Sequence, residues 1–329
     1  MRGRDLKHSQ RSANPVGWAD RLQIDMAQSS PGMYQAKGGV ASATEVLIEI
    51  GHAGIATVTL NRPQCHNAFY PEMSMAIADA LEDLDGREDV RVVVLSGAGK
   101  SFCAGGDIAH MKSTIGFTRR QNLLEARQVT RMFYVLHGMT KPTVAKVRGA
   151  ARGGGVGLVA ACNIAICSDD ANFRLSEVRV GMVPAMIAPF VVAAIGERQA
   201  TRYFLSGEQF GADDARRVGL VHAVVPGDAL DGAVDRLTDE LRQGAPGALS
   251  ATKLEVRAAA RNGIRTAGIG AAARTIAKTR VGSEAQEGLR AFLEKRKPEW
   301  NSGAARPAKS RRTQSTRVRT LPASTRDQP

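Results

Sequence analysis

The sequence predicts an α/β protein, because short apolar segments alternate with helical patterns along most of its 329 residues. Residues 92–95 form a continuous apolar run, which is typical of a strand in a sheet that is covered on both faces. Apolar residues make up 43% of the chain and charged residues 23%, so the composition permits a large core and excludes a chain that is disordered throughout.

The elements are expected in the following order. Residues 46–50 and 55–60 predict two strands around a Gly-containing turn, which together indicate a hairpin. A helix is expected over 71–84, because Pro71 suits a first helical turn and apolar residues recur on one face. Later patterns predict strands at 92–95, 143–147 and 164–167 and helices at 121–137, 156–162, 213–218, 229–243, 248–261 and 284–295.

The net charge of +13 lies mostly at the two ends of the chain. Residues 1–43 carry six basic and three acidic side chains, and residues 303–329 carry seven basic and one acidic, so the ends hold +9 of the total. Both ends lack apolar periodicity, and we expect a disordered extension over 1–43 and a basic disordered tail over 302–329. We interpret the charge as that of solvated, disordered ends. The alternative is that the ends attract polyanions non-specifically. We do not expect a nucleic-acid partner.

Neither a membrane segment nor a metal site is expected. The first 30 residues lack the apolar stretch of a signal peptide, and the longest apolar run, 181–196, is too short to span a bilayer and contains two prolines. The cysteines Cys65, Cys103, Cys162 and Cys167 have no CxxC spacing, which argues against a zinc site and a disulfide scaffold. We therefore expect a soluble, cytoplasmic protein.

Two nucleotide-binding motifs are excluded by single residues. Gly99-Lys100-Ser101 resembles the end of a phosphate-binding loop, but Val94 stands where that motif needs its first glycine. The Gly153-Gly154-Gly155 run resembles a dinucleotide fingerprint, but Leu158 stands where the last glycine is required. Nucleotide hydrolysis and nicotinamide redox chemistry are therefore not expected.

Two Gly-rich loops favour another kind of site. Residues 101–107 and 152–155 each leave a predicted strand, and the second opens a helix. Glycines let a ligand approach the backbone closely, and a helix N-terminus adds unpaired N–H donors and a positive dipole end. If the loops converge, they form an oxyanion hole; the alternative for each loop alone is that its glycines only permit a tight turn.

Seven segments together resemble the crotonase superfamily, the enoyl-CoA hydratase/isomerase family, over about residues 44–300. They are residues 60–63 with 67–69 (LNRP and NAF), 101–108 (SFCAGGDI), 141–145, 149–155, 173–181 (FRLSEVRVG), 212–221 and 287–298 (EGLRAFLEKRKP). The resemblance implies an α/β crotonase (ClpP-like) spiral of ββα turns over 44–240. It also implies a C-terminal helical region over 241–301 that mediates homotrimers, often paired into hexamers.

The resemblance also implies the site. The family binds acyl-CoA thioesters and stabilises a thioester enolate with two backbone N–H groups, which align here with Gly106 and Gly154. Coenzyme A is part of the substrate, and no separate cofactor is implied. The residues that align with CoA-binding positions are Gln64, His66, Ala104, Asp107, Ile108 and, reaching a neighbouring subunit's CoA, Phe292 and Lys295. For Lys295 the alternative is an ordinary exposed helix lysine.

The acid–base groups decide the reaction within this family. Typical hydratases carry two glutamates; one aligns with Glu177, and the other position is occupied by Gly157. A carboxyl group at 177 in an apolar pocket would have a raised pKa suited to proton transfer, whereas the alternative is a surface or salt-bridged glutamate. His137 is interpreted as a packed helix residue and Cys103 as a small loop residue. Arg152 is either a ligand for a substrate carboxylate or a structural arginine.

We predict hydration of a 2-enoyl-CoA. The residues around 153–162 and 174–205 resemble the methylglutaconyl- and isohexenylglutaconyl-CoA hydratase-like branch, which favours a branched or carboxylated acyl group. A Δ3,Δ2-enoyl-CoA isomerase needs only one carboxylate and is the nearest alternative. A non-catalytic homologue that binds acyl-CoA, or RNA through the basic ends, is the alternative of another class.

Overall fold

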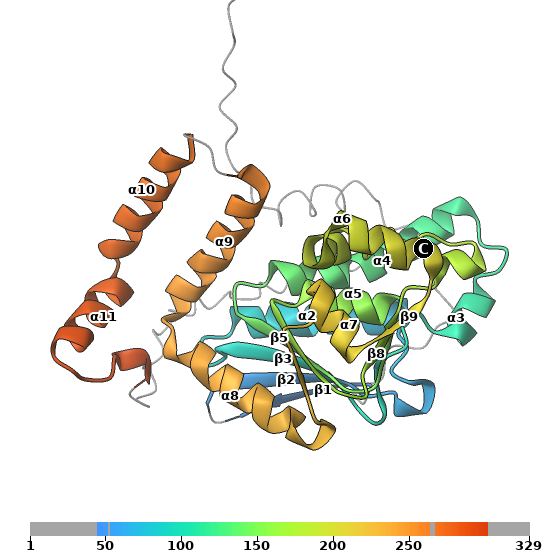
Figure 1. The fold of residues 1–329 in the computed structure, drawn as a ribbon, viewed down its shortest axis with the longest axis horizontal. Coiled ribbons are helices and arrows are strands. Elements are labelled where there is room, and N and C mark those ends of the chain that lie inside the picture. Colours follow the sequence, from blue (N-terminus) through green and yellow to red (C-terminus); the bar gives the residue numbers. More distant parts are fainter. Residues whose placement is uncertain (1–44, 52, 264–266, 302–329) are drawn as a thin grey trace, which may run out of the picture. The chain divides into compact units, whose positions relative to one another are not determined.

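The computed structural model describes residues 45–51, 53–263 and 267–301. Figure 1 shows these residues as helices and strands coloured along the chain. The disordered extension predicted for 1–43 and the basic tail predicted for 302–329 lie outside the described residues. No helix in the described part of the chain is long and apolar enough to cross a membrane.

A six-stranded sheet forms the centre of the fold. Its strands are β1 (Val46–Ile50), β2 (Ile55–Leu60), β3 (Val92–Gly97), β5 (Thr143–Val147), β7 (Ile164–Ser168) and β10 (Ala223–Val225), paired in that order. β1 and β2 form the expected antiparallel hairpin, and the remaining neighbours are parallel. The strands predicted from sequence are therefore confirmed, and β10 was not predicted.

Strand β3 is apolar over residues 92–95 because both of its faces are covered. Val93 and Leu95 belong to the main core, together with side chains of α2 (Pro71–Gly86), α4 (Arg119–Gly138) and α5 (Gly154–Ala161). Val92 and Val94 point to the opposite face, where they pack against Leu230 and other apolar residues of α8 (Leu230–Gln243). Figure 1 shows α8 on the other side of this sheet from α2 and α5.

A second, four-stranded sheet consists of very short strands. They are β4 (Ser101–Cys103), β6 (Ala150–Arg152), β8 (Asn172–Arg174) and β9 (Gln209–Gly211), paired in that order. The first three are parallel, and β9 is antiparallel to β8. The prediction that residues 101–103 and Arg152 lie in loops was wrong, because both belong to this sheet. Three residues give too little pattern for sequence analysis to find a strand.

The chain alternates between the two sheets and then forms a helix. β3 and β4 precede α3 (Ile108–Ser113) and α4; β5 and β6 precede α5; and β7 and β8 precede α6 (Ala188–Ser206). This is the spiral of ββα turns that the sequence predicts. The later helices are α7 (Ala212–Val218), α8, α9 (Pro246–Asn262), α10 (Ala267–Arg280) and α11 (Ser283–Leu293). Short 3-10 helices occur along the chain at η1 (Pro63–Cys65), η2 (Glu177–Val180), η3 (Gly227–Ala229) and η4 (Glu299–Asn301).

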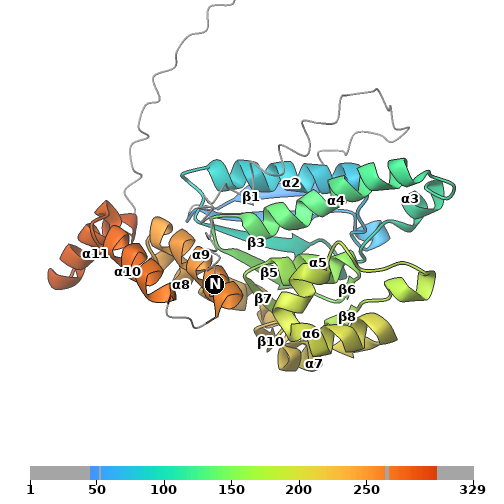
Figure 2. The ribbon, with the colours of Figure 1, turned by 90° about the horizontal axis from the view of Figure 1, so that it is seen from above.

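Helices α2 and α4 pack side by side, as Figure 2 shows from above. The Arg131 guanidinium of α4 forms ion pairs with Asp79 and Glu82 of α2, each at 2.7 Å. At its other end α4 meets the C-terminal helices: Lys253 Nζ of α9 donates to Met139 O at 2.7 Å and to Lys141 O at 2.5 Å. The two Lys253 hydrogen bonds anchor α9 to the segment between α4 and β5.

Candidate active site

Three neighbouring parallel strands of the small sheet carry the predicted catalytic residues just beyond their C-terminal ends. Gly106 follows β4, Gly154 follows β6 and Glu177 follows β8. Parallel neighbours bring such ends to one edge, which is where open α/β sheets bind ligands. Residues separated by more than 70 positions in the sequence are thereby brought together.

The two Gly-rich loops converge as predicted. A Cβ atom built on Gly105 would lie 2.7 Å from Arg152 O and 3.2 Å from Gly154 N, so the first loop lies directly against the N-terminus of α5. Gly105 has a φ of +83°, a conformation that favours glycine. Contact this close between backbones leaves no room for a side chain at Gly105.

Gly106 and Gly154 both present N–H groups without an acceptor among the hydrogen bonds of the described chain. The residues on either side of Gly106 pair with Phe69: Phe69 N donates to Gly105 O at 2.8 Å, and Asp107 N donates to Phe69 O at 2.9 Å. The N–H of Gly106 takes no part in this pairing. Gly154 is the first residue of α5, so its N–H has no partner in the preceding turn. Donors of this kind, at a positive helix end, suit a developing negative charge.

Phe69 links the two donors. Its backbone is paired with the residues on both sides of Gly106, and its ring covers Gly154: a Cβ atom built there would lie 3.0 Å from Phe69 Cε1 and still closer to Cζ. The ring is buried and packs edge-on against Phe133, with centroids 6.2 Å apart. Phe69 therefore sets the space between the oxyanion loop and the start of α5.

Glu177 lies beside Gly153, the residue that precedes the Gly154 donor. It begins η2, and a Cβ atom built on Gly153 would lie 3.0 Å from Glu177 Oε1. Its Oε2 atom is buried and has no hydrogen-bond partner in the described structure. Burial raises the pKa of this carboxyl group above its ordinary value, in opposition to a hydrogen bond from the residue's own backbone. A partly desolvated carboxylate with one unpaired oxygen, close to the start of α5, is suited to moving a proton.

The position of the absent second glutamate is filled by apolar atoms. A Cβ atom built on Gly157 would lie 2.8 Å from Ile187 Cβ and 3.0 Å from Phe133 Cε1. The glycine is evident in the sequence, but the lack of space for a side chain is evident only in the structure. Of the two positions that carry the glutamates of typical hydratases, only 177 thus holds a carboxylate in the described structure.

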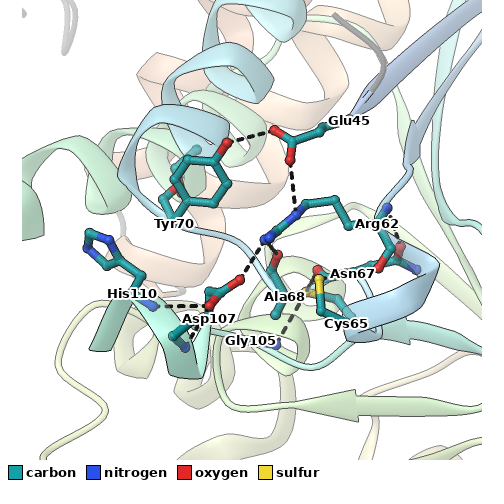
Figure 3. A network of polar contacts seen from close by, with 12 residues as sticks. Glu45, Arg62, Cys65, Asn67, Ala68, Tyr70, Gly105, Asp107 and His110 are labelled. Carbon is teal, nitrogen blue, oxygen red and sulfur yellow. Dashed lines mark hydrogen bonds and ion pairs between the residues drawn. The ribbon is translucent and has the colours of Figure 1, made fainter. Parts of the chain in front are cut away.

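Four side chains behind the first loop form a polar network that the sequence did not predict (Figure 3). Arg62 Nη1 donates to Asp107 Oδ2 at 2.8 Å, and Arg62 Nε lies 3.1 Å from Glu45 Oε1. The Tyr70 hydroxyl donates to Glu45 Oε2 at 2.7 Å. The LNRP motif contains Arg62, but nothing in its spacing indicates these partners.

Comparison with known proteins identifies the family. A family described as "Enoyl-CoA hydratase/isomerase" matches residues 51–303. A "Putative enoyl-CoA hydratase" of Thermus thermophilus is 37% identical over 254 residues, which is 77% of this chain and 99% of that protein. The chain belongs to the enoyl-CoA hydratase/isomerase family.

Solved structures agree with this result. A putative enoyl-CoA hydratase/isomerase (crotonase) from Legionella pneumophila has a TM-score of 0.76 and 40% identity, and covers 79% of this chain and 100% of its own. Pseudomonas aeruginosa AtuE has a TM-score of 0.74 and 37% identity, and covers 78% of this chain and 99% of its own. The fold is thus the crotonase fold, and membership of the enoyl-CoA hydratase/isomerase family implies an acyl-CoA substrate.

The CoA-binding residues predicted from the family are placed around the first loop. Gln64 is exposed in η1, and His66 Nδ1 lies 2.9 Å from Ser101 Oγ. The N–H of Ala104 donates to His66 O and that of Asp107 to Phe69 O, so a nucleotide base would have to be bound by their carbonyl oxygens. Ile108 is 81% exposed. These roles remain predictions.

The remaining predicted residues are placed as follows. Phe292, near the end of α11, and Lys295 are exposed, and Lys295 has a φ of +55°. The Arg152 guanidinium donates to Asn172 O at 2.8 Å and to Gln209 Oε1 at 3.1 Å. It therefore links three strands of the small sheet, and its structural interpretation is favoured over that of a substrate ligand.

His137 and Cys103 also have structural surroundings. The His137 ring packs 5.4 Å from that of Phe190, and burial, with nearby cationic side chains, lowers its pKa to about 4. Cys103 is buried, and burial raises the pKa of its thiol to about 12, which does not suit a nucleophile. Among the described residues no group of three or more His, Cys, Asp or Glu side chains is arranged to hold a metal ion.

Introducing a side chain at Gly157 is expected to destabilise the protein, because no space is left there for a second base. Gly157→Ala should lower the free energy of unfolding by about 1–3 kcal/mol, since the new methyl group overlaps Ile187. Adding Ile187→Ala should recover part of that loss, because the two changes share one space. Denaturant unfolding of the three variants tests this, and an unchanged midpoint for Gly157→Ala would contradict the packing described.

Proposed function

We propose that the protein adds water to a 2-enoyl-CoA, with Glu177 as its only acid–base carboxylate and the N–H groups of Gly106 and Gly154 as oxyanion donors. The observation that carries the proposal is a buried Glu177 carboxylate, with one oxygen unpaired, that lies against Gly153 where the two Gly-rich loops with their free N–H donors converge. The names of relatives support the class, among them the hydroxycinnamoyl-CoA hydratase-lyase of Pseudomonas fluorescens, 34% identical over 61% of this chain and 74% of that protein.

One carboxylate can complete the reaction in two steps. The water oxygen bonds to C3 while Glu177 takes a water proton, and the π electrons of the C2–C3 double bond move onto the thioester oxygen. The N–H groups of Gly106 and Gly154 stabilise the resulting enolate. The enolate then takes the proton back from Glu177 at C2, which restores the carboxylate and yields the 3-hydroxyacyl-CoA.

A Δ3,Δ2-enoyl-CoA isomerase is the second candidate, and the apolar surroundings of Gly157 favour it. In that reaction Glu177 removes a proton from C2 of a 3-enoyl-CoA and delivers it to C4, and no water has to be held by a second carboxylate. A relative of Streptococcus mutans, 29% identical over 64% of this chain and 80% of that protein, is named a trans-2-decenoyl-[acyl-carrier-protein] isomerase.

A turnover assay read by mass spectrometry separates the two reactions. We expect crotonyl-CoA or 3-methylglutaconyl-CoA to gain the mass of one water. Conversion of a 3-enoyl-CoA without a change in mass, with no hydration of either 2-enoyl thioester, would instead assign the isomerase reaction. No conversion of any of the three would overturn both proposals.

Our proposal for the acyl group rests on the resemblance to one branch of the family. The resemblance of residues 153–162 and 174–205 to the glutaconyl-CoA hydratase-like branch supports a branched or carboxylated acyl chain. Arg152 does not supply the matching cation, because its guanidinium is bound by Asn172 and Gln209. Preference for 3-methylglutaconyl-CoA over crotonyl-CoA in the same assay would support the carboxylated class.

We further propose that α9–α11 mediate a homotrimer, singly or paired as a hexamer, with Phe292 and Lys295 facing a neighbouring subunit's CoA. The support is a set of apolar side chains that are more than half exposed: Leu254, Val256, Ile269, Ile276, Leu289, Phe292 and Leu293. Exposed apolar surface of this extent typically marks an interface. Light scattering of the full chain is expected to give three or six subunits, and a monomer would contradict it.

A further inference from the structure

We propose that Arg62 is a positioning residue of the oxyanion hole, holding the peptide of Gly106 in place from both sides. The inference rests on the proposed role of Gly106 and goes beyond it, because Arg62 contacts none of the reacting atoms. It follows from the network of Figure 3 and from the backbone pairing of Phe69.

One nitrogen of Arg62 bonds to both segments that frame Gly106. Nη1 donates to Ala68 O at 2.6 Å and to Asp107 Oδ2 at 2.8 Å. Ala68 precedes Phe69, whose backbone pairs with Gly105 and Asp107, and Asp107 directly follows Gly106. The Arg62 nitrogen therefore joins the two segments next to the bridge that holds Gly106.

The carboxylate of Asp107 extends this hold into α3. Its Oδ1 accepts from Ala109 N at 2.8 Å and from His110 N at 3.1 Å, which caps the helix that begins after the oxyanion loop. Although burial opposes it, hydrogen bonds from the His110 N–H and from Arg62 lower the pKa of Asp107. The carboxylate is thus ionised at neutral pH and fixed on both of its oxygens.

Arg62 is itself fixed in place. The Arg62 and Asp107 side chains are 15% and 10% exposed, which limits screening by solvent. Glu45 lies 3.1 Å from Arg62 Nε, and the guanidinium carbon lies 4.9 Å from the centre of the Tyr70 ring. Arg62 N also donates to Asn67 Oδ1 at 2.9 Å, which fixes the backbone at the base of the side chain.

This arrangement affects catalysis because an oxyanion donor works by position. A donor displaced by a fraction of an ångström loses much of its interaction with the enolate and little of its interaction with the neutral thioester. A lysine carries the charge but cannot reproduce the planar guanidinium, which bonds to Ala68 and Asp107 on one side and faces Glu45 on another. Loss of Arg62 should therefore lower kcat much more than it changes KM.

The test compares wild type with Arg62→Met, Arg62→Lys and Glu45→Gln. Arg131→Met is the matched control, because Arg131 also pairs with two carboxylates but joins α4 to α2 away from the loop. On the converted enoyl-CoA we expect Arg62→Met to lower kcat by about 10- to 100-fold, with KM within about threefold of wild type. Arg62→Lys should recover only part of this loss, Glu45→Gln should lose less than Arg62→Met, and Arg131→Met should retain its kcat.

A binding ratio separates positioning from general stability. Acetoacetyl-CoA enolises readily and presents an oxyanion, whereas butyryl-CoA binds as a neutral thioester. We expect the ratio of their affinities, measured on folded protein, to fall in Arg62→Met and Arg62→Lys and to stay unchanged in Arg131→Met. An unchanged ratio in both Arg62 variants would overturn the inference. Absence of turnover by wild type would instead overturn the proposed function, and the ratio would still decide the role of Arg62.

Discussion

Glu177→Gln is expected to remove nearly all turnover while leaving acyl-CoA binding intact. Glutamine keeps the size of the side chain but can neither accept nor return the proton, and positioned acid–base groups contribute roughly 10²- to 10⁴-fold in rate. The loss should appear in kcat, with the dissociation constant of butyryl-CoA changed little. Glu82→Gln is the matched control, because Glu82 of α2 is an exposed carboxylate that pairs with Arg131 of α4. A glutamine variant that retains most of its activity would contradict the assignment.

The raised pKa of Glu177 sets the direction of the pH dependence. The proton acceptor must be ionised, so kcat/KM of the wild type should decline as pH falls through a pKa that lies above the ordinary value of 4.5. Burial of this carboxylate, which outweighs the hydrogen bond from its own backbone, makes the folded state bind its proton more tightly than the unfolded state. Its contribution to stability is therefore lost as pH rises from 4.5 through the raised pKa.

The same linkage predicts the stability of the variant. As pH rises from 4.5 through the raised pKa, the melting temperature of Glu177→Gln should increase relative to that of wild type. Above this range the difference between the two melting temperatures should stay constant. Melting curves from pH 4 to 8 measure this, with Glu82→Gln again as the control. A difference that is independent of pH would indicate that the Glu177 carboxylate is solvated rather than buried.

The second large effect is expected from Gly154→Ala. The new methyl group would overlap the Phe69 ring, which is held by its backbone bonds and by Phe133, so the start of α5 and its N–H must shift. Loss of one oxyanion donor typically lowers kcat by about 10²- to 10³-fold.

Gly106→Ala is the matched control for this prediction. A Cβ atom built there would lie 2.5 Å from Met111 Cε, the end of a flexible side chain that can move aside. We expect kcat within about threefold of wild type for Gly106→Ala, because the N–H is retained and only Met111 repacks. Steady-state kinetics of the two variants test the geometry, and equal losses at both positions would contradict it.

Much of the central fold follows from sequence patterns because its elements are long or strongly apolar. Strand β3 was predicted from its uninterrupted apolar run, and the structure supplies the reason: alternate residues pack on α8 and on the main core. Helix α6 was not predicted, since Gly196, with a φ of +74°, interrupts its helical pattern. The strands of the small sheet have three residues each and were found only through their pairing.

The parts of the candidate site that depend on residue type could be predicted from the sequence. The parts that depend on how side chains pack together could not. The glycines at 106 and 154 and the glutamate at 177 were selected by loop composition and family resemblance, and they lie just beyond the ends of adjacent strands. The packing of Ile187 against Gly157 brings together residues 30 positions apart in the sequence and leaves no sign in either segment. Arg62 and Asp107 are 45 positions apart, and no periodicity joins them.

The measurement that most directly tests the single-carboxylate mechanism is hydration of crotonyl-CoA in D2O, with the product's stereochemistry read by NMR. If Glu177 both takes the proton from water and returns it to C2, the new deuterium and the new hydroxyl must lie on the same face of the former double bond. The account predicts this one stereoisomer for the wild type and no product for Glu177→Gln. Addition to opposite faces, a mixture of stereoisomers, or continued turnover by Glu177→Gln would show that another group moves the proton.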